Sequence, residues 1–342
     1  MIKYILLILF LNSINLIILY KAKTIAKILS LIDKPIQKRS LHLKPVPKIG
    51  GLILFYNIIF INLYLIYVNN TYSELNILIL FSSLVFFIVG YLDDYFDLSA
   101  FKKFLLITVS IIVIYFFNNK ILLNFLYFSI LDKTFYLENI SFIFTFFCIY
   151  LLINAFNMAD GINGLSLSIF STWIIFLCFY SKNFDISFIF LFFPILIILL
   201  FFNLKNKIFI GNSGSHLLGG LVSIITIYLY NSEYLETSNE KKLYVENIFL
   251  LFLIPGIDCA RLFIYRLFIL KKSFYRADKN HLHHILIKNF NLSNSLLIYL
   301  SLILIPNFLF VIFKDYILLI IFINILTYIF IIHHYFMLKN EK

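Results

Sequence analysis

The sequence predicts an all-α, polytopic membrane protein with about eleven transmembrane helices. Hydrophobic residues make up 62% of the 342 residues, and charged residues only 13%. The mean hydropathy is +0.97, which soluble domains of this size do not sustain. The net charge of +11 lies in short loops between apolar runs. Basic residues in such loops set topology and meet anionic lipids or substrates, so no nucleic-acid partner is expected.

The predicted spans are windows long enough to cross a hydrocarbon core ~30 Å thick, which takes about 20 apolar residues. They lie at roughly 3–20, 49–68, 76–92, 103–118, 141–156, 163–180, 185–202, 213–230, 246–268, 295–313 and 316–337. No small-residue cleavage site follows the first window, so we expect a span there and not a signal peptide. The stretch 121–131 is predicted to be an additional half-span or an interfacial helix.

The distribution of basic residues predicts the orientation of the chain. The loop after the first window carries Lys21, Lys23, Lys27, Lys34, Lys38, Arg39, Lys44 and Lys48. By the positive-inside rule this loop is cytoplasmic, which places the N-terminus outside. With eleven alternating spans the C-terminus is then cytoplasmic. Ten spans with the N-terminus inside is the main alternative.

Five polar motifs fall in the inner loops under this topology. They are DKPIQKRSLHLKPVPKIGG, DDYFDLSAFKK, NAFNMADGING, KNKIFIGNSGS and KKSFYRADKNHLHH. The outer segments carry only generic polar residues. We therefore expect a single membrane domain over residues 1–342 with a site facing the cytoplasm. Its functional loops would lie at about 21–48, 93–103, 154–164, 203–215 and 269–294.

The adjacent acids Asp93 and Asp94 are the first candidates, because carboxylates beside a bilayer lose solvation and repel each other. A divalent cation or a cationic partner is the usual compensation, and Lys103 is a candidate ion-pair partner or phosphate contact. Asp97 follows Asp93 by one helical turn and would share its face. The alternative is that these acids are solvated caps, with Ser99 as N-cap of the next helix. In either case the pair is expected to stabilise no core.

Two further motifs combine glycines with small polar side chains after an apolar run. NAFNMADGING offers oxygen ligands and hydrogen-bond donors, although Asn-Gly is also an ordinary turn sequence. Its candidate residues are Asn154, Asn157, Asp160 and Asn163. IFIGNSGSHLLGG resembles a phosphate-binding turn ahead of a helix, beginning at Gly211, although small residues also permit tight packing of membrane helices. Phe209 is a candidate for stacking on a planar base.

The segment ADKNHLHH gathers three histidines in a basic inner loop. They are His281, His283 and His284, near Lys271, Lys272, Arg276 and Lys279. Neutral or protonated imidazoles in this setting fit the recognition of anionic phosphates. A zinc site is the alternative, and it would need companion ligands from elsewhere in the chain.

With these five motifs in this order, the chain resembles the polyprenyl-phosphate N-acetylhexosamine-1-phosphate transferases, bacterial integral membrane enzymes of glycosyltransferase family 4. The resemblance covers about residues 30–290, and the spacing H-L-H-H is similar to that of the N-acetylhexosamine branch. It implies that a polyprenyl (undecaprenyl) phosphate oxygen attacks the β-phosphorus of a UDP-N-acetylated sugar at the bacterial inner membrane. The products are polyprenyl-diphospho-sugar and UMP. The implied cofactor is Mg²⁺, with Mn²⁺ as an alternative, and a homodimer is a further expectation.

The resemblance also implies roles for individual residues. The catalytic positions are Asp93, Asp94 and Asp160, and the metal positions are Asn157, Asn212 and Asp94. The substrate-binding positions are Lys48, Lys103, Asn154, Asn163, Phe209 (stacking on uracil), Gly211, His281, His283 and His284. Asn212 departs from the family, because most relatives have Asp there; an amide oxygen still ligates Mg²⁺, but without the charge. Asn163 departs in the same way from many bacterial relatives.

Two other functions stay open from the sequence. Asn212 suggests a catalytically weakened homologue that acts as a scaffold. A membrane transporter would place charges midway along several spans or show internal repeats, and the sequence shows neither. The identity of the sugar does not follow from the motifs, and residues 269–294 are the expected place of its recognition.

Overall fold

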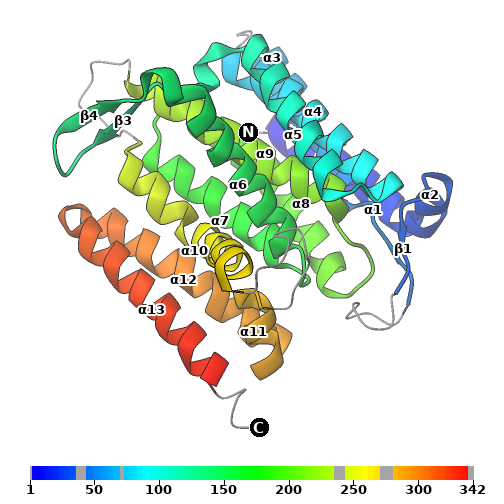
Figure 1. Cartoon of the computed structure of the whole chain (residues 1–342). Helices are drawn as coiled ribbons and strands as arrows, with labels where there is room; N and C mark the ends of the chain where they lie inside the picture. Colours follow the sequence, from blue (N-terminus) through cyan, green and yellow to red (C-terminus); the bar gives the residue numbers. More distant parts are fainter. Residues whose placement is uncertain (1, 36–43, 70–72, 235–242, 270–279, 338–342) are drawn as a thin grey trace. The chain divides into compact units, whose positions relative to one another are not determined.

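The structure is a computed structural model that describes residues 2–35, 44–69, 73–234, 243–269 and 280–337. Most of these residues are helical (Figure 1). The α-helices are α1 Ile2–Tyr20, α2 Ala22–Ile28, α3 Gly50–Asn69, α4 Glu74–Phe96, α5 Ala100–Phe117, α6 Ser141–Ala159, α7 Leu165–Tyr180, α8 Ile186–Leu204, α9 Gly211–Tyr234, α10 Val245–Ile264, α11 Leu282–Asn289, α12 Leu292–Ile312 and α13 Ile317–Met337. A π-helical turn, Tyr265–Ile269, continues α10.

Every predicted span window coincides with one of these helices. Ten of the described helices are long and apolar enough to cross a membrane, which confirms a polytopic membrane protein. The window at 163–180 corresponds to α7, an apolar helix of only 16 residues. The number of crossings and the orientation of the termini stay predictions.

The structure corrects the expectation for residues 121–131. A 3₁₀ turn, Asn119–Ile121, leads into the antiparallel hairpin β3 Phe125–Phe128 and β4 Lys133–Tyr136. The expected half-span or interfacial helix is therefore wrong. The aromatic run FLYF favours a strand, and four residue pairs join the two strands, whereas a short isolated helix is only marginally stable. A second, shorter pairing joins β1 Ile32–Asp33 to β2 Val46–Pro47.

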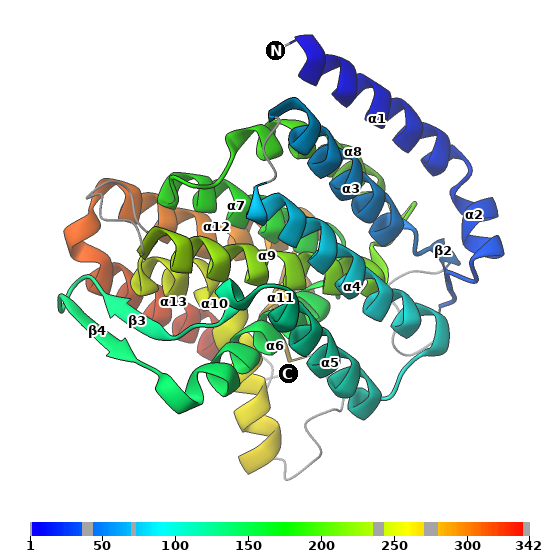
Figure 2. The same cartoon turned by 90° about the horizontal axis from the view of Figure 1, so that it is seen from above.

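The chain divides into two compact units. Unit 1 comprises Met1–Ile121 and Phe184–Tyr228, and unit 2 comprises Leu122–Asn183 and Leu229–Lys342. In unit 1, α3 packs against α4 and α8, and α4 packs against α5. The peripheral α1 lies beside α3 and α8 (Figure 2).

The boundary between the units falls within α9, which is the most buried of the long helices. In its apolar window 94% of the residues are buried, against 17% for α1. The sequence GNSGSHLLGG explains this, because glycine and serine let neighbouring helices approach closely. The buried side of α1 is marked by Leu11, Asn15 and Leu19, which recur every four residues along the helix.

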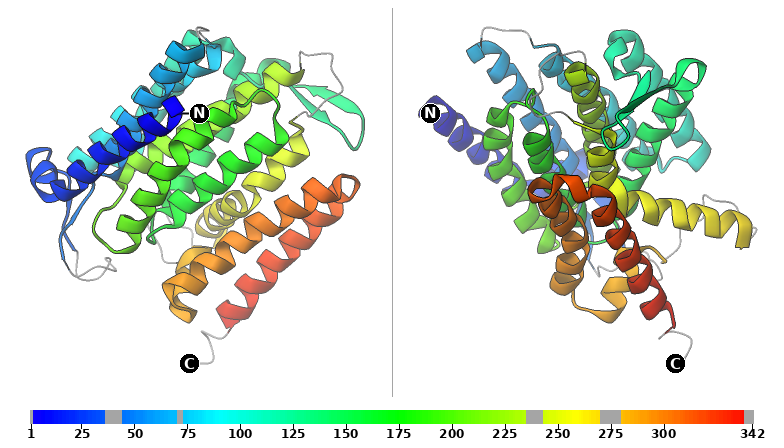
Figure 3. Two further views of the ribbon diagram at one scale, coloured as in Figure 1. Left: turned by 180° about the vertical axis from the view of Figure 1, so that it is seen from behind. Right: turned by 90° about the vertical axis from the view of Figure 1, so that its left-hand side faces the viewer.

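Unit 2 is organised around α10, which packs against α6 and α12. The side chain of Trp173 on α7 is fully buried and meets Phe156 of α6 and Phe252 of α10 edge to face. The C-terminal helices α12 and α13 run side by side (Figure 3, orange and red), and the short α11 packs against both. This packing holds the histidine segment against the end of α10.

Candidate functional site

The first turn of α9 is wedged against α4 in unit 1. A Cβ placed at Gly90 of α4 would overlap the backbone of Asn212 and Ser213. Only glycine allows this approach, because the clashing atoms belong to the main chain and cannot rotate away. The end of α4 that carries the acidic pair is thereby fixed beside the GNSGS motif.

Asp94 caps the N-terminus of α9. Its carboxylate accepts hydrogen bonds from the backbone N–H of Asn212 at 3.0 Å and of Ser213 at 2.8 Å. Its side chain has no exposed surface. Gly211 opens the helix at a φ of 70°, which leaves space for the carboxylate. The N–H groups of Asn212 and Ser213 that the sequence offered to a phosphate are thus bonded to Asp94.

Asp93 is equally buried but has different partners. Nζ of Lys103 lies 2.8 Å from its Oδ2, and the N–H of Leu98 donates to its Oδ1 at 3.2 Å. The predicted ion pair is therefore present. Asp97 is exposed and ends α4 in the left-handed conformation, so it does not share the environment of Asp93.

These contacts decide between the alternatives for the acids. Ser99 is the N-cap of α5, accepting from the N–H of Lys102, as predicted. The interpretation of Asp93 and Asp94 as solvated caps is wrong, because both side chains are fully buried. The expectation that they stabilise no core is also wrong. Together they join the last turn of α4 to the first turn of α5 and to the start of α9.

Lys48 joins the site from the segment before α3. Its Nζ lies 3.2 Å from Asp33 and 3.7 Å from Asp94. Burial lowers the pKa of Lys48, but the attraction of Asp94 and Asp33 outweighs it, and the net pKa is raised. Phe209 is half-buried nearby, and its backbone bonds to Pro47 and Gly50.

His216 lies one turn into α9, where the sequence assigned it no role. Its Nδ1 donates to the carbonyl of Asn212 at 2.8 Å. The imidazole is buried and interacts electrostatically with Asp93 and Lys103. Unit 1 therefore gathers Lys48, Asp93, Asp94, Lys103, Phe209, Gly211 and Asn212 from the predicted residues.

The asparagine motif lies in unit 2 at the end of α6. Asn154 donates to the carbonyl of Tyr150 in its own helix at 2.8 Å. Asn157 is half-buried on the same helix, and Asp160 ends it. The hydroxyl of Ser166 donates to the Asp160 carboxylate at 3.4 Å. Asn163 stands in the turn that follows.

Gly161 brings the asparagine motif together with the histidine segment. A Cβ at this position would lie 2.8 Å from Nε2 of His283 and 3.3 Å from the ring of His284. The rings of His281 and His283 stack with centroids 5.5 Å apart. Unit 2 thus places two of the five motifs in direct contact.

Among these histidines, His283 is neutral. Burial lowers its pKa well below the usual range, and the neighbouring His284 and His281 act in the same direction against the weaker pull of Asp258. Of the two protonation states that the sequence allowed, this lowered pKa favours the uncharged one for His283. His284 is half-buried. The basic residues Lys271, Lys272, Arg276 and Lys279, like Lys38 and Arg39, lie outside the described residues.

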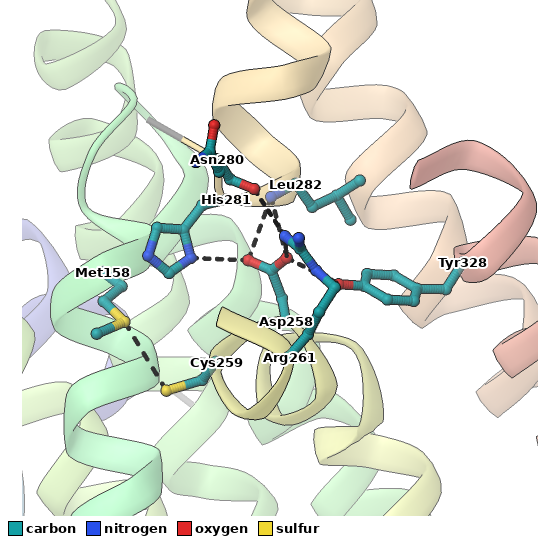
Figure 4. A network of polar contacts seen from close by, with 8 residues as sticks. All are labelled: Met158, Asp258, Cys259, Arg261, Asn280, His281, Leu282 and Tyr328. Carbon is teal, nitrogen blue, oxygen red and sulfur yellow. Dashed lines mark hydrogen bonds and ion pairs between the residues drawn. The ribbon is translucent and has the colours of Figure 1, made fainter. Parts of the chain in front are cut away.

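Sequence reasoning missed a polar network around Asp258 of α10 (Figure 4). Its carboxylate accepts from Arg261 at 2.9 Å and from the hydroxyl of Tyr328 at 2.9 Å. It also meets Nδ1 of His281 at 2.9 Å. The signal was present in the sequence: an acid inside an apolar window, with an arginine three residues later on the same helical face.

The predicted metal ligands fall in both units. Asp94 and Asn212 adjoin in unit 1, and Asn157 lies in unit 2. Within the described ranges no three His, Cys, Asp or Glu side chains gather in a way that could hold a metal ion. Asparagine oxygens are outside that set of groups, so the Mg²⁺ prediction stays untested.

The family description "Glycosyl transferase family 4" matches residues 76–230 of the chain. Among curated proteins, the undecaprenyl-phosphate alpha-N-acetylglucosaminyl 1-phosphate transferase of Thermotoga maritima is 28% identical over 284 residues, which cover 81% of this chain and 79% of that protein. The probable undecaprenyl-phosphate N-acetylglucosaminyl 1-phosphate transferase of Bacillus subtilis is 28% identical over 79% of this chain and 73% of its own length. The enzyme from Escherichia coli K12 is 27% identical over 79% and 72%. These similarities confirm the resemblance that the five motifs predict.

Proposed function

We propose that this chain, a relative of the glycosyl transferase family 4 proteins, transfers a sugar 1-phosphate from a UDP-N-acetylhexosamine to undecaprenyl phosphate. The acceptor phosphate oxygen forms a bond to the β-phosphorus of the nucleotide sugar, and the bond from that phosphorus to the UMP oxygen breaks. The products are undecaprenyl-diphospho-sugar and UMP. Similarity to named transferases over about four fifths of the chain supports the reaction class.

The observation that carries this proposal is the buried acid–lysine cluster at the end of α4. Asp93 pairs with Lys103, and Asp94 lies near Lys48, beside the last turn of a membrane-spanning helix. A reaction between a lipid phosphate and a nucleotide diphosphate requires charged groups at the membrane boundary to bind and orient anions. Lysines held by buried carboxylates meet that requirement. Under the predicted topology this cluster faces the cytoplasm at the bacterial inner membrane.

Mg²⁺ is the proposed cofactor, and Asp94 and Asn212, which adjoin in unit 1, are the residues there that would hold it; Asn157, the third predicted ligand, lies in unit 2. Carboxylate and amide oxygens are the hard donors that Mg²⁺ takes, and it usually keeps water and substrate phosphate in its remaining positions. When bound it would neutralise charge on the diphosphate. Because Asn212 contributes no charge, we expect weaker binding than an aspartate would give. Activity should disappear with EDTA and return with Mg²⁺.

A direct assay tests the reaction. Purified protein, shown to be folded by monodisperse elution, is given undecaprenyl phosphate and a panel of UDP-N-acetylated sugars. UMP release is measured, and the lipid product is identified by mass. The panel also identifies the sugar. Absence of UMP with every UDP-N-acetylated sugar would overturn the proposed reaction.

Asn212 favours one second candidate, a catalytically weakened homologue that acts as a scaffold. The substitution Asn212→Asp separates the two functions, because it restores the residue that most members of the resembled family carry. An inactive parent with an active Asn212→Asp variant would support the scaffold. Turnover by the parent itself excludes that candidate.

A further inference from the structure

Asp258 is a buried carboxylate within the apolar helix α10, with 4% of its surface exposed. Burying a carboxylate is costly unless its oxygens are bonded. Here Oδ1 accepts from Arg261 and Tyr328, and Oδ2 faces His281 (Figure 4). The backbone N–H of Leu282 adds a contact to each oxygen, at 3.1 and 3.2 Å. The carboxylate therefore ties α10 to the histidine segment and to α13.

The contact with His281 fixes the tautomer of that imidazole. A carboxylate flanked by an arginine can only accept, so the proton of the 2.9 Å bond belongs to Nδ1 of His281. In the neutral ring Nε2 is then a hydrogen-bond acceptor. Figure 4 shows this second nitrogen pointing away from Asp258, on the side of Met158. His281 and Met158 line the same small cavity, of about 10 Å³, which His283 and Tyr299 also border.

The same carboxylate positions the start of α11. His281 is the N-cap of this helix, but its own side chain makes no capping bond there. Asp258 supplies the acceptor for the N–H of Leu282, the first residue of the helix. His283 follows one residue later, stacked on His281 and pressed against Gly161. Asp258 therefore fixes the ring of His281 by a hydrogen bond, and His281 fixes the neutral ring of His283 by stacking.

We propose that Asp258 is a positioning residue for the transfer reaction: by holding the Nδ1–H tautomer of His281 and the first turn of α11, it sets the ring of His283, which stacks on His281, against the Asp160–Gly161 turn. This inference rests on the proposed function, because the histidines and Asp160 are candidate substrate and catalytic residues of that reaction. Asp258 itself touches no substrate in this proposal. Its effect is transmitted by His281.

A double-mutant cycle tests the transmission. Asp258→Asn keeps the size of the side chain but presents an NH₂ group, which favours the opposite tautomer of His281. His281→Asn keeps a donor toward Asp258 and removes Nε2. Each single variant should lower kcat/KM for the nucleotide sugar about 10- to 100-fold, the usual effect of losing a group that orients a functional histidine. The double variant should equal the worse single variant within about twofold, because both changes break one path.

Glu246→Gln is the matched control. Glu246 is a second buried carboxylate of α10, and it bonds to Ser129 and Ile130 of the hairpin region and not to the histidines. We expect this variant to keep the parental kcat/KM even if its thermal midpoint falls. Loss of activity in parallel with stability in Glu246→Gln and Asp258→Asn alike would show that Asp258 is only structural. Effects of Asp258→Asn and His281→Asn that multiply in the double variant would overturn the proposal as well.

A spectroscopic readout keeps this inference separate from the proposed reaction. The ¹⁵N spectrum of histidine-labelled protein should show His281 protonated at Nδ1 in the parent, assigned by its loss in His281→Asn, and at Nε2 in Asp258→Asn. If the parent releases no UMP, the proposed reaction is wrong. The ¹⁵N spectra would still test whether Asp258 orients His281, because they do not depend on activity. If Asp258→Asn does not fold, His281→Asn decides alone: parental activity in that variant would overturn the proposal. An Nε2–H tautomer in the parent would also overturn it.

Discussion

Asp94 in unit 1 and Asp258 in unit 2 have the same structural role, which is to bond the start of a later helix, but their other partners differ. Each is a buried carboxylate on a helix long and apolar enough to cross a membrane, and each accepts hydrogen bonds from the backbone at the start of a later helix. In both cases the acceptor satisfies N–H groups that have no partner within their own helix. Two motif segments, GNSGS and HLHH, are thereby held in place by acids that are distant in the sequence.

The difference lies in the side chains that surround the two acids. Among the described residues, the cation paired with Asp94 is Lys48, at 3.7 Å, and that lysine is closer to Asp33. Asp258 has Arg261, Tyr328 and His281 within 2.9 Å. A carboxylate bonded mainly to backbone amides keeps lone pairs for a cation or a substrate, whereas one bonded by side chains on several sides is fully committed. We therefore expect Asp94 to take part in the chemistry and Asp258 to support it.

Replacing the unit 1 acids is expected to give the largest effect. In Asp94→Asn the NH₂ group must face one of the backbone donors of Asn212 and Ser213, which leaves that donor without an acceptor. In Asp93→Asn the charge of Lys103 loses its partner. Turnover, measured as UMP release, should fall by at least about two orders of magnitude in each variant. The free energy of unfolding should fall by roughly 1–3 kcal/mol.

Asp97→Asn is the matched control, because Asp97 ends the same helix but is exposed. Its turnover and unfolding midpoint should stay close to those of the parent. If Asp94→Asn loses stability but keeps parental turnover, Asp94 is only a helix cap, and the contrast with Asp258 disappears.

His284→Ala probes the substrate side of unit 2. His284 is the half-buried member of the histidine segment, and its neighbour His283 is neutral and buried. If His284 contacts the diphosphate or the sugar, its loss should lower kcat/KM for the nucleotide sugar. The corresponding loss of transition-state stabilisation should be about 1.5–3 kcal/mol, the scale of a charge-assisted hydrogen bond. The Mg²⁺ dependence should not change. Stoichiometric zinc in the purified protein would contradict this interpretation and favour the metal alternative.

The two acids also show what the sequence could predict. Asp93 and Asp94 stand out as an adjacent pair after an apolar run, and the sequence predicts Lys103 as their ion-pair partner or as a phosphate contact. Asp258 stands alone inside an apolar window. Its partners come from three places, since Arg261 is on α10, His281 precedes α11 and Tyr328 is on α13. Only the packing of unit 2 brings them together.

The positions of the helices were easier to predict than their contacts. Every predicted span window lies on a helix, because a membrane span needs a long apolar run that composition reveals directly. The capping of α9 by Asp94 was missed, because it joins residues more than a hundred positions apart. The hairpin at Phe125–Tyr136 was missed because a short aromatic run fits both a strand and an interfacial helix.

Three glycine-to-alanine variants compare the close contacts of the two units. At Gly90 the new methyl group would meet the backbone of Asn212 and Ser213, and at Gly161 it would meet the movable ring of His283. Gly256 has nothing within 4 Å and serves as the control. Gly90→Ala should lower the free energy of unfolding by about 1–3 kcal/mol, as expected for overpacking, and Gly161→Ala by less, since a ring can rotate. Thermal unfolding in detergent measures the order, and a Gly161 effect that exceeds the Gly90 effect would contradict it.

The smallest predicted effect is the pH dependence that His283 gives to unit 2. The pKa of this histidine is lowered well below its usual value of about 6.5, so the unfolded chain binds a proton there that the folded protein does not. Stability from this group is therefore complete above about pH 6.5 and is lost as the pH falls. Between pH 7.5 and pH 5.5 the loss should be on the order of 1 kcal/mol, because the unfolded chain takes up its proton over this range. His281, His284 and Asp258 are the titratable neighbours that interact with the ring.

His283→Asn isolates this contribution from the rest of the protein, because Asn keeps a polar group but does not titrate. The difference in unfolding free energy between pH 7.5 and pH 5.5 should be smaller in His283→Asn than in the parent, by an amount on the order of 1 kcal/mol. An equal pH dependence in the parent and in His283→Asn would mean that His283 takes up its proton in the folded protein. In that case the contrast between an uncharged histidine in unit 2 and the charged acid–lysine cluster of unit 1 would not hold.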